Sequence, residues 1–327
     1  MGHRIFIVVA PAVFAVYMPF CTPAVRPTMP ASDVAVAALW ESPDDLESRD
    51  LFNGPWPVKR GPDPQATYTF VETKHHGVNP GMTVRDPQGR KWSVKQAPAD
   101  GRQSEAPIEV TLSRVLSAVG YHQPPVYFLP SFTLQDESGT HVEPGGRFRL
   151  HDKSLKDVGE WSWQQNPFVG TKPFQGLLVI LLMFNSSDLK NENNTLYEHK
   201  VDGGVESWYV VRDLGTALGE TGRVAPRRGD IELFERLPFI LGVRNGFVNF
   251  DYHGFHQELV RGRITSDEAA WASDLMSRLS DRQWRDAFRA GGYAPDLAAR
   301  FIARLRTNAA QAARIGGDDW RPAGERR

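Results

Sequence analysis

The sequence predicts an α+β protein with two lobes, a strand-rich first half followed by a mostly helical second half. Residues 67–73, 82–85 and 91–95 have the short alternating pattern of β-strands. Residues 172–184 are apolar on every side, which is typical of a helix in the middle of a fold. Beyond residue 230 the periodicity is almost entirely helical. This order of elements is the basis of the predicted fold class.

The composition allows a large core and gives no sign of a polyanionic partner. The chain has 327 residues, of which 41% are hydrophobic. Its formal net charge is -1, and lysines and arginines are scattered apart from the Arg227–Arg228 pair. We therefore expect no nucleic-acid partner. Cys21 is the only cysteine, so packing rather than an intramolecular disulfide must stabilise the fold.

Residues 1–24 predict a secretory signal peptide, which would place the mature protein in the periplasm or outside the cell. A short basic start that contains Arg4 precedes a nearly continuous apolar run at residues 5–20. Small and turn-forming residues follow, and we expect cleavage just after Ala24. No stable membrane span is expected after this cleavage.

Two alternatives to a cleaved signal were weighed. A membrane-spanning helix is disfavoured because the apolar run is shorter than the roughly 20 residues that a bilayer needs. Pro11 and Pro19 also interrupt it. Cys21 is a candidate site for lipid attachment and lipoprotein anchoring, but the bulky Phe20 before it argues against this alternative.

The strand-rich lobe is expected at residues 66–150, after a lead-in segment at residues 25–65 that shows no candidate chemistry. Its third strand ends at Lys95 and follows the Asp86–Gly89 turn, since Asp-Pro-x-Gly suits a type I turn. One helix, residues 105–119, comes next, with acidic residues near the start where the helix dipole favours them. The other elements expected here are a short helix at 34–40 and strands at 126–134 and 146–150.

The helical lobe is expected at residues 151–320. The buried helix at 172–184 leads into a polar run at 185–194, and a hairpin follows across the turn at 201–204. The remaining elements expected in this lobe are the hairpin strands at 195–199 and 208–212 and helices at 230–241, 266–279, 281–290 and 295–315.

Three short motifs in these elements carry the candidate chemistry. Asp188-Leu-Lys-Asn-Glu-Asn193 follows the buried helix, Asp213-Leu-Gly215 ends the hairpin, and Trp92-Ser-Val-Lys95 closes the third strand. In this order they resemble the catalytic loop His-Arg-Asp-Leu-Lys-Pro-Glu-Asn, the metal-binding Asp-Phe-Gly and the Val-Ala-Ile-Lys signature of protein kinases. The resemblance covers roughly residues 66 to 310, although the specific motifs total only about a dozen positions.

The resemblance implies a two-lobed protein-kinase-like fold, with an antiparallel sheet and one key helix in the first lobe. It also implies which residues would act during transfer of the phosphate. Asp188 would accept or orient the attacking hydroxyl, and Lys190 would offset charge on the transferred group. Lys95 would hold the inner phosphates of ATP. Glu109, or as the weaker alternative Glu105, would pair with that lysine.

The resemblance further implies a site for ATP with Mg²⁺. Asn193 and Asp213 offer the hard oxygen ligands that suit Mg²⁺ bridging phosphate oxygens. Gly77 and Gly81, in the turn-rich segment before the second strand, would lie against the phosphates. The alternative is that each motif is an ordinary loop or turn. Only the order in which the three motifs follow one another favours a site.

Several departures place the chain among atypical relatives. Ser186-Ser187 stands where the family has His-Arg, no Ala-Pro-Glu follows Gly215, and the glycine-rich loop is reduced to two glycines. The helix from Glu109 to Gly120, followed by prolines, is similar to that of HipA-type kinases, and phosphoinositide-kinase-like proteins are comparable cases. These departures leave the acceptor open.

Two classes of function follow from these observations. The first is an exported phosphotransferase that moves the γ-phosphate of ATP to a hydroxyl of an unidentified protein or small molecule, with nucleotidyl transfer as a variant. The second is a non-catalytic nucleotide-binding pseudokinase or a kinase-shaped scaffold. Retention of Lys95, Asp188, Asn193 and Asp213 favours the enzyme. The scarcity of ATP outside the cytoplasm favours the alternative.

Overall fold

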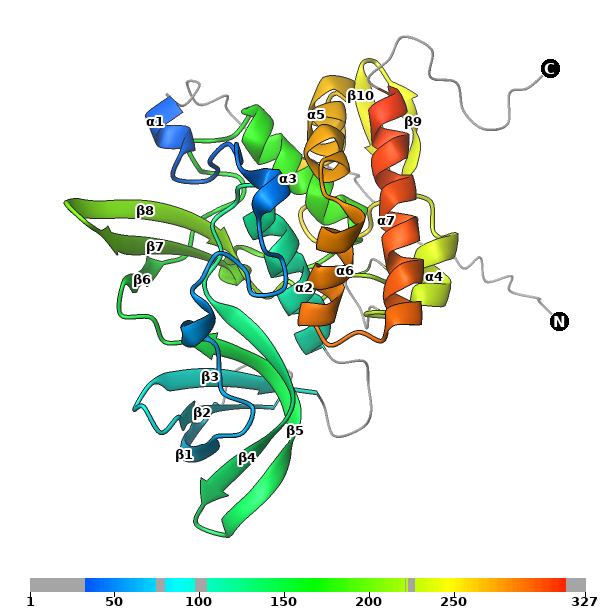
Figure 1. Ribbon diagram of the computed structural model, residues 1–327. Helices are drawn as coiled ribbons and strands as arrows, with labels where there is room; N and C mark the ends of the chain where they lie inside the picture. The colour runs from blue at the N-terminus through cyan, green and yellow to red at the C-terminus, as the bar shows by residue number, and fades with distance from the viewer. Residues whose placement is uncertain (1–32, 75–79, 98–104, 221, 223–226, 316–327) are drawn as a thin grey trace, which may run out of the picture.

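The computed structural model describes residues 33–74, 80–97, 105–220, 222 and 227–315. It confirms the α+β class and the order of a strand-rich first half and a helical second half. Figure 1 shows a strand barrel at one end, the long helices at the other, and a smaller sheet beside them. The predicted signal peptide and Gly77 lie outside the described residues.

A closed five-stranded barrel forms the strand-rich end, in the order β1-β2-β3-β5-β4. Its strands are β1 Thr67–Thr73, β2 Gly81–Arg85, β3 Lys91–Gln96, β4 Val126–Asp136 and β5 Gly139–Leu150. Alternating apolar side chains fill it, among them Tyr68, Trp92 and Phe148. We predicted an antiparallel sheet, and four pairings are antiparallel. The pairing of β1 with β4 is parallel and closes the barrel.

The β4–β5 hairpin is longer than predicted. We expected strands at 126–134 and 146–150, but pairing continues out to Asp136 and Gly139. The outer part of β5 is largely exposed. Opposite it, Phe132 and Leu134 of β4 are buried in the barrel core, so packing on the β4 side supports this part of the hairpin.

Helix α2, Glu105–Ala118, packs between the barrel and the helices. We had assigned it to the strand-rich lobe. Its apolar residues Leu112, Val115 and Leu116 are fully buried in the same cluster as the helices of the second half. On its other side Val110 packs with Val126 of β4. The helix therefore carries Glu105 and Glu109 at the junction of the two halves.

Helix α3, Lys172–Met183, lies at the centre of the helical half, as its all-apolar sequence predicted. Thr171 caps it by accepting a hydrogen bond from the backbone N–H of Phe174. The predicted helices around it are also present, α6 beginning with a capping box at Ser280. They are α5 Ser266–Ser277, α6 Asp281–Ala290 and α7 Pro295–Ile315. None of the described helices combines the length and apolarity of a membrane span.

The helix predicted at residues 230–241 is wrong over its second half. Helix α4 is short, Ile231–Arg236, because Leu237 turns to an extended conformation before Pro238. Proline disfavours helical backbone in the residue before it. An unpredicted hairpin follows, formed by β9 Ile240–Arg244 and β10 Phe247–Phe250.

The polar hairpin predicted after the central helix is present and belongs to a small sheet. Its strands are β7 Asn194–Val201 and β8 Gly204–Val211, and an unpredicted strand, β6 Leu155–Gly159, pairs with β7. The hairpin begins directly after the candidate catalytic loop and ends two residues before Asp213. It therefore returns the chain to the place where that loop lies.

The lead-in segment packs against the helices. Its helix α1, Asp33–Val36, is shorter than the predicted 34–40. Short helical turns η1 (Leu46–Ser48) and η2 (Val58–Arg60) follow as the chain crosses toward β1 (Figure 1). Leu46 is completely buried in the helical core. This segment is thus part of the fold.

Replacing Gln283 by Ala should lower the free energy of unfolding by about 2 kcal/mol. The buried Gln283 amide donates to the carbonyl oxygens of Leu46 at 2.7 Å and Arg49 at 3.1 Å, and its loss leaves Leu46 with only the bond from the N–H of Arg49. Chemical denaturation with an unchanged m-value is the measurement. Arg282→Ala is the matched control on the same helix, since the Arg282 side chain is 88% exposed. Equal losses in the two variants would contradict this anchoring role.

Candidate functional site

The predicted site residues that the structure describes line or adjoin one cavity between the barrel and the helical half. This cavity has a volume of about 330 Å³. Lys95 reaches it from β3, Asp188 and Asn193 from the loop after α3, and Asp213 from the end of β8. Lys190 and Gly81 also line it. Residues separated by more than a hundred positions in the sequence therefore meet here.

The loop after α3 is held in place by its backbone and by buried side chains. Asn185 adopts a left-handed conformation with φ of 51°, and its amide donates to the carbonyl of Gly219 at 2.9 Å. The Ser187 N–H donates to the carbonyl of Thr216 at 3.2 Å. Leu189 is buried in the core. These contacts fix the loop on both sides of Asp188.

The side chains of the loop contact one another. Lys190 Nζ lies 2.8 Å from Asp188 Oδ1. The Asn193 amide donates to the carbonyl of Asp188 at 2.8 Å, and the carbonyl of Asn193 accepts from the N–H of Arg212 at 2.8 Å. The last bond joins the loop to the residue before Asp213. The amide oxygen of Asn193 makes none of these bonds and remains an acceptor.

Lys95 lies among three carboxylates, but the order of its partners differs from our expectation. Its Nζ is 2.5 Å from Glu105 Oε2, 3.4 Å from Asp213 Oδ1 and 3.8 Å from Glu109 Oε2. We had placed Glu109 first. Glu109 instead pairs with Arg147 at 3.0 Å. Glu105 and Glu109 share one helix face because residues four apart are neighbours, so spacing alone does not rank them.

Charges around the cavity keep Lys95 and Asp213 ionised. Burial disfavours the charge on Lys95, but Glu109, Asp213 and Glu105 outweigh it and raise the pKa of its ammonium group. Burial likewise disfavours the charge on Asp213, yet Lys95 and the neighbouring arginines lower the pKa of its carboxyl. Both groups are therefore charged at neutral pH.

Asp213 sits in a strained turn that packs tightly against α2. Its φ is 52°, a left-handed conformation that Asp tolerates better than most residues. Leu214 is buried in the core and anchors the turn. A Cβ on Gly215 would lie 2.4 Å from Glu105 Cβ, so glycine permits the close approach. The Asp-Leu-Gly motif thus positions Asp213 beside helix α2, whose Glu105 contacts Lys95.

Replacing Gly215 by Ala should lower both thermal stability and activity. The new methyl group would overlap Glu105, and overpacking of this kind costs about 1–3 kcal/mol. The required shift also separates Glu105 from Lys95. Thermal unfolding and turnover are the two measurements. Gly204→Ala is the control, since a Cβ there meets nothing within 4 Å. A Gly215→Ala protein that behaves like wild type would show that the turn is loosely packed.

The donor set fits a magnesium ion shared with phosphates. Asp213 offers an ionised carboxylate and Asn193 a free amide oxygen, both at the cavity. No group of three His, Cys, Asp or Glu side chains suited to a metal occurs among the described residues. Mg²⁺ is usually held by one or two carboxylates together with substrate phosphates and water. Asp213 and Asn193 are thus the residues that would hold it.

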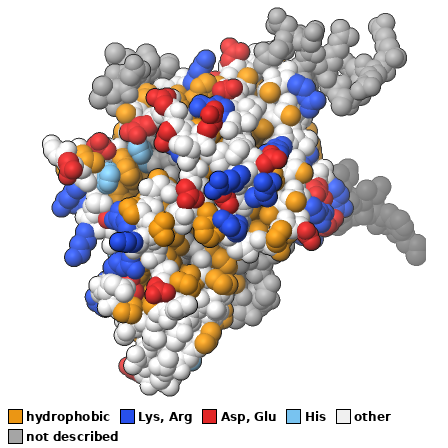
Figure 2. Space-filling view, in the orientation of Figure 1, with side chains coloured by type: hydrophobic (Ala, Val, Ile, Leu, Met, Phe, Trp, Pro, Cys, Tyr) orange, Lys and Arg blue, Asp and Glu red, His pale blue; other side chains and the backbone are white. Residues whose placement is uncertain are grey.

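Sequence reasoning missed most of the basic residues of the cavity. Seven lysines and arginines line it, against three carboxylates from Glu105, Asp188 and Asp213. The five that we did not single out as site residues are Lys74, Arg147, Arg149, Arg212 and Arg228. Alternation along the strand places Arg147 and Arg149 on one face, which was a usable signal. Over the face shown in Figure 2, by contrast, acidic and basic side chains are interspersed.

Other candidates from the sequence are placed as follows. Gly81 starts β2 opposite Lys95, so its backbone borders the cavity. His253 and His256 each pair with a nearby carboxylate. Trp161 and Trp163 are buried and pack edge to face.

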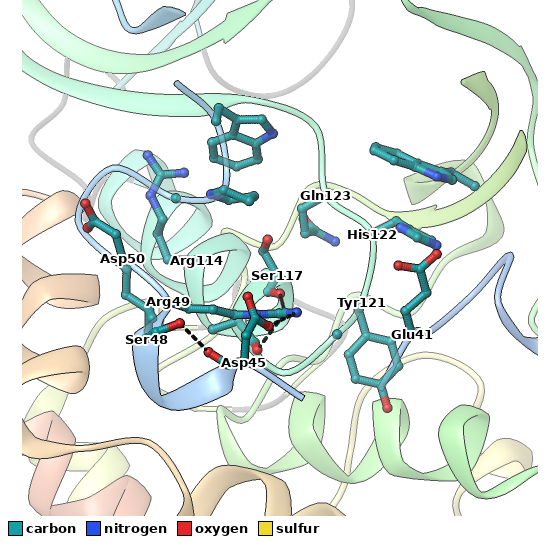
Figure 3. A pocket seen from close by; sticks show the side chains of 17 residues that line it. Glu41, Asp45, Ser48, Arg49, Asp50, Arg114, Ser117, Tyr121, His122 and Gln123 are labelled. Atoms are coloured by element: carbon teal, nitrogen blue, oxygen red, sulfur yellow. Dashed lines mark hydrogen bonds and ion pairs between the residues drawn. The ribbon is translucent and has the colours of Figure 1, made fainter. Parts of the chain in front are cut away.

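A second cavity, of about 420 Å³, lies between the lead-in segment and the C-terminal end of α2 (Figure 3). Its charged groups largely satisfy one another. Arg49 pairs with Asp45 at 2.7 Å and donates to the carbonyls of Ser117 and Ala118. His122 stacks on Trp208 with ring centroids 4.6 Å apart. None of the predicted site residues lines this cavity, and it is the weaker candidate.

Comparison with known proteins finds a likeness among solved structures only. No protein-family model matches the chain, and no curated protein matches it. The chain is similar to the proinflammatory kinase CtkA of Helicobacter pylori, with a TM-score of 0.44 and 11% sequence identity. The match covers 77% of this chain and 97% of that one. A likeness of this size does not establish a family, so the function has to rest on the geometry of the cavity.

Proposed function

We propose that this chain is an exported, kinase-like phosphotransferase of an atypical branch. It would move the γ-phosphate of ATP, with Mg²⁺, to a hydroxyl of a protein or a small molecule. The observation that carries the proposal is the 3.4 Å contact between Lys95 and Asp213, beside Asp188 and Asn193 in one cavity. These are the residue types that phosphoryl transfer needs at one place.

Each of these side chains has a role that its position supports. Lys95, fixed by Glu105, would bind the inner phosphates as a point charge. Asp213 and Asn193 would hold Mg²⁺, which neutralises charge on the phosphates when it is bound. Asp188 would orient the attacking hydroxyl, and Lys190, paired with it, would stabilise charge on the transferred group.

One observation favours a second candidate, a non-catalytic nucleotide binder. Asp213 already contacts Lys95 and lies close to several arginines that lower its pKa. A carboxylate neutralised by the protein attracts a metal ion less strongly than a free one. Binding of nucleotide without Mg²⁺ and without transfer would be the consequence.

Product analysis separates the two candidates. The protein would be incubated with Mg²⁺, ATP labelled at the γ-phosphate and a panel of hydroxyl-bearing peptides and small molecules. Transfer of the label supports the phosphotransferase, and a mass increase by a nucleotide would identify nucleotidyl transfer. Calorimetric binding of ATP without any transfer across the panel would favour the binder. No binding and no transfer would leave only the kinase-shaped scaffold.

A further inference from the structure

The basic residues of the cavity divide into those with a carboxylate partner and those without. Lys95 and Arg228 both contact Glu105, Arg147 contacts Glu109, and Lys190 contacts Asp188. These pairs account for the neighbouring acidic groups.

Lys74 and Arg149 have no such partner within the part of the chain that the structure describes. Lys74 donates to the hydroxyl of Ser93, which carries no charge. Arg212 is intermediate, since it bonds Tyr197 at 3.1 Å and lies 3.7 Å from the exposed carboxylate of Asp157. Three positive charges therefore face the cavity without a close carboxylate contact, and the Asp213 carboxylate acts on Arg149 and Arg212 only at longer range.

The register of the barrel explains why these charges gather. On β3 and β5, Ser93 pairs with Arg149 and Lys95 pairs with Arg147. Side chains two residues apart in a strand share a face, so all four point to the same side of the sheet. Lys74, directly after β1, reaches the same place through Ser93. The uncompensated group thus lies on the barrel wall next to Lys95.

Gathering these charges is costly in the free protein. Burial lowers the pKa of Lys74 to about 8, with further lowering from Arg149, Arg147 and Arg212. Burial also lowers the pKa of Arg149 to about 10, and again the adjacent arginines contribute. Perturbed pKa values cluster at functional sites. A bound anion would relieve the repulsion.

The wall of the cavity suits phosphate groups better than a flat base. Val94 is the only lining residue in the described chain with a purely hydrocarbon side chain, and none is aromatic. Organic ligands are normally held against apolar or aromatic surface. Arginine and lysine, by contrast, bind phosphate oxygens through charge-assisted hydrogen bonds.

We propose that Lys74, Arg149 and Arg212 form a second phosphate subsite beside the one at Lys95. This subsite takes an additional phosphate group of the substrate. The inference rests on the proposed function only because that function identifies the transferred phosphate. This group has two sources with the same chemistry, either a longer phosphate chain on the donor or a phosphate monoester on the acceptor.

Calorimetry with inorganic tetraphosphate, whose chain is one phosphate longer than that of ATP, tests the first source with and without Mg²⁺. Arg149→Met and Lys74→Met should each weaken its binding by at least about tenfold, the loss expected for one charge-assisted contact. Each should also raise the melting temperature of the ligand-free protein, because a repelling charge is removed. Arg244→Met is the control, since Arg244 is exposed and lies outside the cavity.

Binding of O-phosphoserine to the protein saturated with a non-hydrolysable ATP analogue and Mg²⁺ tests the second source. If Arg149→Met weakens the binding of O-phosphoserine but not of the inorganic phosphate chain, the subsite belongs to the acceptor. The proposal is overturned if both variants bind every probe within about twofold of wild type. If tetraphosphate binding depends on Arg149 but no phosphate is ever transferred, the subsite stands and the proposed function falls.

Discussion

Replacing Asp213 by Asn should reduce phosphate transfer by about three orders of magnitude while the protein stays folded. Asn keeps the size and the turn-forming ability of Asp in the left-handed conformation at this position. It removes the charge that contacts Lys95 at 3.4 Å and that would bind Mg²⁺. The loss should appear mainly in turnover, since the metal stabilises charge that develops during transfer.

The control for Asp213→Asn is Asp202→Asn. Asp202 lies at the exposed tip of the same hairpin and does not line the cavity. Both variants should give the same circular dichroism spectrum and similar melting temperatures. Titration with Mg²⁺ adds a second readout, because only Asp213→Asn should raise the concentration needed for half-maximal activity. Full activity in Asp213→Asn would remove this residue from the metal site.

Replacing Lys95 by Met should abolish activity and destabilise the protein by about 3 kcal/mol. Lys95 is mostly buried and contacts Glu105, Asp213 and Glu109, so its removal leaves carboxylates without their shared counter-charge. Arg228 and Arg147 still compensate Glu105 and Glu109 in part, which limits the loss. Chemical denaturation at neutral pH measures it.

The double variant Lys95→Met with Glu105→Gln separates structure from chemistry. Removing the Glu105 charge should restore part of the lost stability, because one carboxylate without Lys95 is gone, while Arg228 loses its partner. Activity should stay absent, since no cation remains at the position of the inner phosphates. Recovery of activity together with stability would mean that Lys95 serves only the fold.

The sequence predicted the elements whose signals are local. The strand at 67–73, the buried helix at 172–184 and the polar hairpin after it can be read from periodicity and turn residues alone. The helix expected at 230–241 failed because Pro238 was overlooked as a stop signal. The closure of the barrel by β1 and β4 was not predictable in this way, because it joins strands far apart in the chain.

The sequence predicted which residues form the site, but not the excess of basic residues that line the cavity. Lys95 and Asp213 are 118 positions apart, and only the resemblance of their motifs indicated that they would meet. The basic wall was missed because it depends on which strand pairs with β3. Once β5 takes that place, Arg147 and Arg149 follow from the register. Scattered basic residues in a nearly neutral sequence therefore did not exclude a concentrated positive field.

The placement of α2 determines which parts can move against each other. Its apolar side is buried with the helices, whereas its first turn reaches Lys95 on the barrel. A rigid-body rotation of the barrel would have to break the ion pairs of Lys95 and the pair of Arg147 with Glu109, and also the contacts of α2 with β4 and β5. Widening the cavity therefore costs ion pairs, which salt weakens, and packing, which salt does not weaken.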